Sequence, residues 1–163
     1  MLKLHALSEK KKESLITYIY VGAIFIVLAV VYSIHLPSSL WNRLVDFFSS
    51  LTLYPVPRVG IPLPAPAFPS AQMELYVAAF QFSLGLGILE ISILALRIVM
   101  HSSMSRKAET VGNLVFWLGT GYLVSTYLLN MTMESEWFVF WAGVILIAGL
   151  SLVGRAFILL ANR

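Results

Sequence analysis

Long runs of apolar residues without charge constrain this chain more than any other feature of its sequence. No charged residue occurs from Leu15 to Ile34 or from Val111 to Leu129. Crossing a hydrocarbon core of about 30 Å takes about 20 apolar residues, and backbone in lipid must satisfy its hydrogen bonds internally. Each run is therefore long enough to cross a membrane as an α-helix.

Two further segments meet the same criterion with few charges. Residues 73–100 contain only Glu74, Glu90 and Arg97, and residues 137–160 contain only Arg155. Soluble domains are roughly half apolar and a quarter charged, whereas this chain is 59% hydrophobic and 12% charged. We therefore predict an all-α integral membrane protein, a four-transmembrane-helix bundle that forms one domain over residues 1–163. Its spans are expected at about 15–34, 73–100, 111–129 and 137–160.

The distribution of Lys and Arg predicts the orientation of these spans. If the spans alternate in direction, all of the eleven Lys and Arg residues except Arg43 and Arg58 fall on one side. Short connections rich in Lys and Arg stay in the cytoplasm. We therefore predict a multi-pass protein whose N- and C-termini are both cytoplasmic, with an outer insert formed by residues 35–72.

The first half of the outer insert has the pattern of a short amphipathic helix. From residue 39 to residue 51, one side carries polar residues such as Asn42, Arg43 and Asp46, and apolar residues recur on the other side at helical spacing: Leu40, Trp41, Leu44, Val45, Phe48 and Leu51. We interpret it as a collar at the membrane interface, because helices that grip anionic lipid carry many Lys and Arg residues on the polar face.

The second half of the outer insert is rich in proline and also apolar. Its prolines are Pro55, Pro57, Pro62, Pro64, Pro66 and Pro69. So many prolines are incompatible with a helix and favour an extended loop. Because its apolar residues are unfavourable in water, the segment should either fold over its own helices or dock against a partner subunit. The candidates for partner docking are Pro57, Ile61, Leu63 and Phe68.

A carboxylate inside a predicted span is the main candidate for a functional residue. Glu90 lies fifteen residues beyond Leu75, about 22 Å along a helix, and an ionisable side chain at such a position costs about 2.5–3.5 kcal/mol on insertion. We expect an intramembrane charge cluster consisting of Glu90, Arg97, Glu109, Asn113 and Arg155. The cluster could be an ion-pair network that fixes helix register, or Glu90 could handle protons or cations.

Uncharged polar residues in the spans could have either of two roles. Gln81, Ser83 and Thr120 could line a polar path or form hydrogen bonds between helices, which is the commoner use of such side chains.

Several kinds of chemistry find no support in the sequence. The chain has no cysteine, and its histidines, His5, His35 and His101, fall in parts of the predicted topology that cannot converge. No metal site, cofactor or catalytic constellation is expected, and the basic residues do not form the patch of a nucleic-acid binder. A lipid-modifying intramembrane enzyme would need a nucleophile and base that we do not find.

These observations favour a non-catalytic accessory or scaffold subunit of a larger membrane protein complex. Its partners would be the lipid bilayer and other membrane subunits or further copies of the chain. The alternative is a small homo-oligomeric channel or an ion- or proton-coupled transporter that uses Glu90.

Overall fold

A computed structural model describes residues 9–35, 37–57, 59–130 and 134–161, and this part of the chain is mostly helical. The α-helices are α1 (Glu9–Ile34), α2 (Pro37–Ser49), α3 (Met73–Val99), α4 (Met104–Leu123) and α5 (Glu134–Leu160). Two short helical turns flank them: the 3₁₀ turn η2 (Pro69–Gln72) precedes α3, and the π-helical turn η3 (Val124–Leu128) follows α4. Two strands, β1 (Leu51–Pro55) and β2 (Pro62–Pro66), pair as an antiparallel sheet.

Three segments of the described chain are long and apolar enough to cross a membrane: Lys10–Ile34, Pro69–Val99 and Ser135–Leu160. They correspond to α1, to η2 with α3, and to α5. Helix α4 is less apolar as a regular α-helix, because it includes Arg106, Lys107 and Glu109 and ends at Leu123. The chain is therefore a membrane protein with three clear candidate spans.

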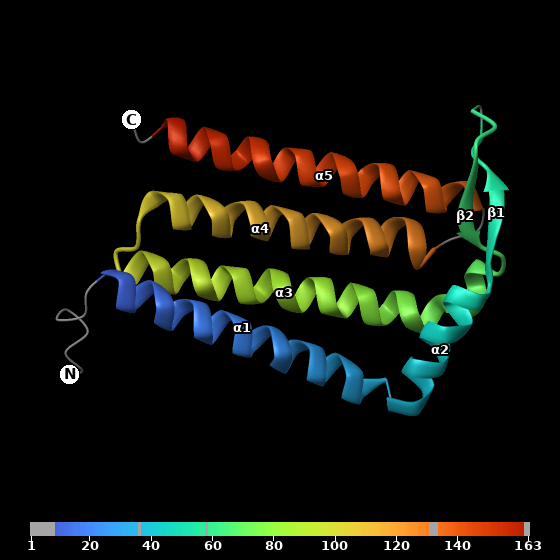
Figure 1. Cartoon of the computed structure of the whole chain (residues 1–163), viewed down its shortest axis with the longest axis horizontal. Coiled ribbons are helices and arrows are strands. Elements are labelled where there is room, and N and C mark those ends of the chain that lie inside the picture. Colours follow the sequence, from blue (N-terminus) through green and yellow to red (C-terminus); the bar gives the residue numbers. More distant parts are fainter. Residues whose placement is uncertain (1–8, 36, 58, 131–133, 162–163) are drawn as a thin grey trace.

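The four long helices lie side by side in a row, so the predicted helix bundle has the form of an open layer (Figure 1). Helix α3 packs against α1 and α4, and α4 packs against α3 and α5, so α1 and α5 occupy opposite edges. The reason lies in α4, which has close contacts on two sides. Its Gly121 lies against Ser83 of α3, whereas its Gly119 lies against Ile147 of α5.

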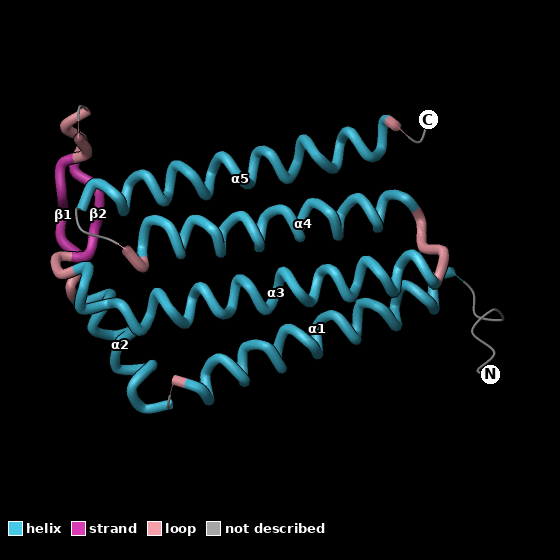
Figure 2. Tube along the Cα trace, turned by 180° about the vertical axis from the view of Figure 1, so that it is seen from behind, coloured by secondary structure: helices cyan, strands magenta, loops and turns pink. Residues whose placement is uncertain are grey.

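The row has two unlike ends (Figure 2). At one end, here called the inner end, α1 begins, α3 ends, α4 begins and α5 ends. At the other, the outer end, α2 and the hairpin of β1 and β2 lie across the helix ends. The outer insert thus covers one end of the row.

Helix α2 is the amphipathic helix of the outer insert, although it ends at Ser49 and leaves Leu51 to β1. Its Phe47 ring packs against Trp137 of α5, with ring centroids 5.9 Å apart. Its Arg43 Nε pairs with Glu74 Oε2 of α3 at 3.2 Å. Trp41, Val45 and Phe48 remain exposed, as expected for side chains that enter lipid at an interface.

The proline-rich segment is a β-hairpin over much of its length, which corrects both the all-α prediction and the predicted extended loop. Leu51 pairs with Pro66 and Pro55 pairs with Pro62 at the two ends of the ladder. At the tip, Val56 N–H donates to Ile61 O at 2.9 Å, and Gly60 adopts a φ of 71° that favours glycine. The prolines permit this pairing because they occupy alternate positions.

The alternation leaves one edge of the hairpin without donors. Hydrogen bonds join Val56 to Ile61 and Ala67 to Ser50. Because the backbone groups of successive residues point to alternate edges of a strand, the residues of β2 whose N–H and C=O groups face β1 are Leu63 and Ala65. Pro62, Pro64 and Pro66 face the free edge of β2 and have no N–H to offer there. One of these prolines accepts a hydrogen bond at this edge, because Trp137 Nε1–H donates to Pro64 O at 3.0 Å.

The buried core lies at the outer end, beneath the hairpin. Ala65 of β2 is fully buried there among side chains of α3, α4, η3 and α5: Tyr76, Leu123, Val124, Leu128, Trp137 and Phe140. The hairpin is thereby held to the helices by its β2 end, and in Figure 1 its tip extends beyond α5.

Candidate functional site

Helix α3 carries a polar stripe toward α4. Tyr76, Ser83, Glu90 and Arg97 are all buried and follow each other at intervals of seven residues, a spacing that places them on one face of a helix. At the outer part of this stripe, Ser83 lies against Gly121 of α4. At the inner part, the stripe meets polar side chains of both α1 and α4.

Glu90 is the most deeply buried charged residue described, with 1% of its surface exposed. It lies nine residues before the end of α3, or about 14 Å from the inner end of that helix. Tyr20 of α1 donates a hydrogen bond from Oη to Glu90 Oε1 at 2.6 Å. Asn113 of α4 lines the same cleft as both groups. No ion pair joins Glu90 to a Lys or Arg of the described chain.

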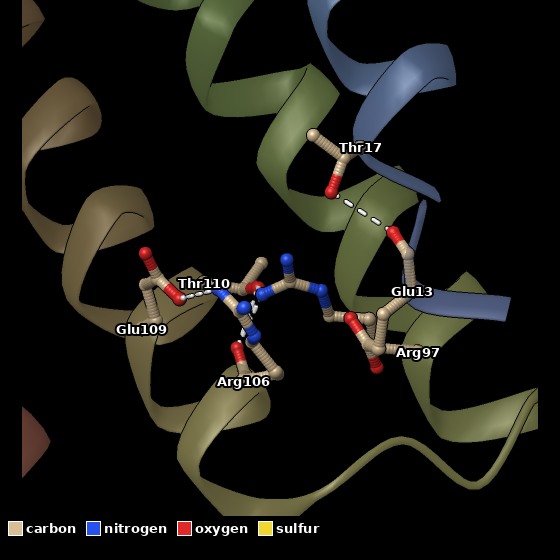
Figure 3. A network of polar contacts seen from close by, with 6 residues as sticks. All are labelled: Glu13, Thr17, Arg97, Arg106, Glu109 and Thr110. Carbon is tan, nitrogen blue, oxygen red and sulfur yellow. Dashed lines mark hydrogen bonds and ion pairs between the residues drawn. The ribbon is translucent and has the colours of Figure 1, made fainter. Parts of the chain in front are cut away.

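Arg97 is held by α4. Its Nη1 donates to the carbonyl oxygen of Arg106 and to Thr110 Oγ1. Figure 3 draws Arg97 between these groups of α4 and Glu13 and Thr17 of α1. Arg97 Nε and both carboxylate oxygens of Glu13 are buried, and none of these atoms has a hydrogen-bond partner in the described chain.

A cleft of about 270 Å³ connects these groups. We call it the inner cleft and define it by its polar lining: Thr17 and Tyr20 from α1, Glu90 and Arg97 from α3, and Arg106, Glu109, Thr110 and Asn113 from α4. Arg106 Nη1 pairs with Glu109 Oε2 at 3.1 Å within this lining. Helix α1 packs against α3, and the cleft lies between side chains of α1, α3 and α4. It can hold water and a small polar ligand beside a buried carboxyl group.

The structure brings four of the five residues of the expected charge cluster to the inner cleft: Glu90, Arg97, Glu109 and Asn113. Arg155 lies elsewhere, at the contact between α4 and α5. A Cβ placed on Gly112 would meet Arg155 Cγ and Cδ at 2.6 Å. The aliphatic part of Arg155 therefore packs on Gly112, and Arg155 does not line the inner cleft.

The residues considered for a polar path fall into separate contacts. Gln81 Oε1 hydrogen-bonds with His35 Nε2 at 3.0 Å and lines a mostly apolar pocket between α1 and α3. Ser83 lies at the α3–α4 contact, and Thr120 Oγ1 is buried without a hydrogen-bond partner among the described residues. None of the three lines the inner cleft.

The four residues considered for partner docking are all exposed. Pro57 lies at the hairpin tip, and the exposed fractions of Ile61, Leu63 and Phe68 are 55%, 44% and 70%. Leu53 of β1 is 71% exposed as well. The same segment is anchored through Ala65 and Pro64, so one part packs on its own helices and another part projects from them.

Sequence reasoning missed Tyr20, whose residue type and place near the end of a span are typical of an interfacial residue, as well as Thr17 and Thr110. The seven-residue interval between Glu13 and Tyr20 on α1, matching that between Glu90 and Arg97 on α3, is a signal that could have found the contact. Within the described residues, no three His, Asp or Glu side chains gather to hold a metal ion.

No protein-family model matches this chain, and neither a similar curated protein nor a similar solved structure was found. The inner cleft and the exposed hairpin are therefore interpreted from their own geometry and chemistry.

Proposed function

We propose that the chain crosses the membrane four times, with α4 and η3 together forming the third crossing. From Thr110 to Leu128 this segment has no charged residue, and its 19 residues are close to the roughly 20 that a span requires. It also lies between α3 and α5 and packs against both. A segment flanked on both sides by spanning helices is best accommodated in lipid with them.

The charges of the two ends support cytoplasmic termini. The inner end carries the cations Lys10, Lys11, Lys12, Arg97, Arg106, Lys107 and Arg155, whereas Arg43 is the cation described at the outer end. The positive-inside rule assigns the inner end to the cytoplasm.

Single cysteines test this topology directly, because the natural chain has none. Ser103→Cys lies at the inner end between α3 and α4, and Asn130→Cys lies between η3 and α5; both positions are exposed. A membrane-impermeant maleimide added to intact cells should label Asn130→Cys fully and Ser103→Cys only after permeabilisation. Equal protection of the two sites would mean that α4 and η3 do not cross the membrane.

The function that these features support best is that of a non-catalytic subunit of a membrane protein assembly. The observation that carries it is the hairpin, whose apolar tip extends past α5 while its base is fixed to the helices. A projection with exposed apolar side chains is unfavourable when left in water. The hairpin tip lies next to the exposed side of α5, which is the helix at that edge of the row (Figure 1).

The exposed side of α5 is suited to a second helix. Ala142, Gly149 and Ala156 are exposed and follow each other at intervals of seven residues, and a Cβ on Gly149 would meet nothing within 4 Å. Small residues at such spacing let helix backbones approach closely in lipid. We define the assembly surface as this stripe together with Pro57, Ile61, Leu63 and Phe68. Its occupant would be a membrane subunit whose transmembrane helix packs along α5 and whose outer part contacts the hairpin.

Two substitutions on the assembly surface test the proposal. Gly149→Leu fills the α5 stripe and Leu63→Lys places a charge on the hairpin, and each should weaken association at least about tenfold, or about 1.4 kcal/mol. Native gels in mild detergent should show the wild-type chain in a larger species, and each variant as a monomer that melts like the wild type.

The matched control is Gly22→Leu, at the opposite edge of the row, where a Cβ also has nothing within 4 Å. It should leave the larger species intact. A wild-type chain that is monomeric and stable in mild detergent, or equal effects of Gly22→Leu and Gly149→Leu, would exclude the proposed assembly surface. Co-expression of two differently tagged copies separates self-association from binding of another subunit.

A further inference from the structure

We propose that Glu90 is a reversible protonation site that exchanges protons with the inner end of the molecule through the inner cleft. The ligand is a proton delivered as hydronium: an O–H bond forms on the Glu90 carboxylate, an O–H bond of hydronium breaks, and water remains. The inference does not rest on the proposed assembly, because it uses α1, α3 and α4 and none of the assembly surface.

The groups around Glu90 can accommodate both of its charge states. The Tyr20 hydroxyl donates to Oε1 at 2.6 Å, which suits an ionised carboxylate. The Asn113 amide, which lines the same cleft as the carboxyl group, can donate through its NH₂ or accept through its carbonyl. It can therefore donate to the carboxylate or accept from the protonated acid. A site with such partners can take up and release a proton without losing its hydrogen bonds.

Size and burial identify the proton as the fitting cation, because Glu90 is 1% exposed and forms no ion pair among the described residues. The titratable and charged groups that face Glu90 are Tyr20 from α1, Arg97 on α3, and Arg106 and Glu109 from α4. Arg106 and Glu109 pair with each other, and Arg97 is engaged by the Arg106 carbonyl and Thr110. Lys10 and Glu13, nearer the inner end, offset each other in formal charge. An unpaired carboxylate in hydrocarbon is unfavourable, and protonation removes its charge without requiring more space.

The inner cleft supplies the route. It shares Thr17 and Arg106 with a cavity of about 470 Å³ that is also lined by Lys10, Ser14 and Tyr18. A water molecule needs about 30 Å³, so the two spaces can hold several. The residues that line these two spaces include four with hydroxyl groups: Ser14, Thr17, Tyr18 and Thr110. A hydrogen-bonded chain of water can thus connect the inner surface with Glu90.

The route is open at one end of the molecule. Toward the outer end, Gln81 belongs to a different and mostly apolar pocket, and neither Ser83 nor Thr120 lines the inner cleft. In the part of the chain that the structure describes, the inner cleft therefore ends at Glu90. This arrangement favours proton binding from one side over conduction through a single copy.

Infrared difference spectroscopy of the full chain in lipid vesicles provides the test. Changing the pH between about 4 and about 9, the range over which carboxyl groups in proteins titrate, should change the C=O stretching band of a protonated carboxyl group. The band should be lost in Glu90→Gln. In vesicles with one orientation, the change should follow the pH on the side of the inner end and not that on the other side.

The route is tested by Thr17→Leu, which places an apolar side chain between the two cavities. This variant should keep the band but slow its response to a pH jump at least about tenfold, whereas the control Ser92→Leu, on an exposed part of α3, should respond like the wild type. If Glu90→Gln does not fold, a hydrophobic carbodiimide and mass spectrometry locate the protonated carboxyl group in the wild-type chain. Labelling of Glu90 that follows inner pH supports the proposal. A constant band, no labelling of Glu90, or response to outer pH would overturn it.

Discussion

Replacing Trp137 with alanine should destabilise the outer end of the molecule by about 3–5 kcal/mol, the usual cost of removing a large aromatic side chain from a packed core. The indole is 8% exposed and packs against the rings of Phe47 and Phe140. It also donates the hydrogen bond that ties Pro64 of the hairpin to α5. Unfolding in detergent, followed by circular dichroism, measures the loss.

Trp141→Ala is the matched control, because Trp141 is on the same helix but 48% exposed. It should lose much less stability than Trp137→Ala. A third variant, Trp137→Phe, keeps most of the packing and removes the N–H donor, so its loss should be about 1 kcal/mol. If Trp137→Ala and Trp141→Ala lost the same amount, the core beneath the hairpin would not have the importance that its burial implies.

A leucine at Gly119 should separate α4 from α5 and destabilise the protein by about 1–3 kcal/mol, as overpacking does in well-packed interiors. A Cβ at this position would lie 2.8 Å from Ile147 Cγ2 and equally close to Cδ1. Ile147 is β-branched and has one strongly preferred χ1 rotamer in a helix. It cannot move aside without moving the backbone of α5.

The comparison for Gly119→Leu is Gly149→Leu, which adds the same side chain where nothing lies within 4 Å. The thermal midpoint in detergent should fall for Gly119→Leu and stay near that of the wild type for Gly149→Leu. A normal midpoint for Gly119→Leu would mean that the α4–α5 contact can widen without cost.

The helical character of the chain was predictable because hydrophobic length alone requires it. The predicted span at about 15–34 lies within α1, and that at 73–100 matches α3 to one residue. The arrangement of the helices was not predictable in the same way. In lipid, every side of a helix can be apolar, so hydrophobicity does not tell which side faces a neighbour. The decisive residues were glycines such as Gly119 and Gly121, which contact α5 and α3 from two sides of α4.

Spacing along a single helix was a better guide to the candidate site than the expected gathering of charges from different helices. Glu90 and Arg97 share a face because they are seven residues apart, and this periodicity was visible in the sequence. Arg155 was expected in the same cluster, but the row of helices places α4 between its helix, α5, and α1. Tyr20 was missed because a tyrosine near the end of a span is usually an interfacial residue, and only the contact between α1 and α3 shows its hydroxyl at Glu90.

The prolines of β2 also limit how large an assembly built through the hairpin can become. A strand that joins the free edge of β2 finds no N–H groups from Pro62, Pro64 or Pro66, so sheet growth in that direction is chemically blocked. The free edge of β1 still has the N–H groups of Leu51 and Leu53. Two copies that paired through β1 would therefore present only proline edges to any third copy, and these edges offer no N–H donors for further strand pairing.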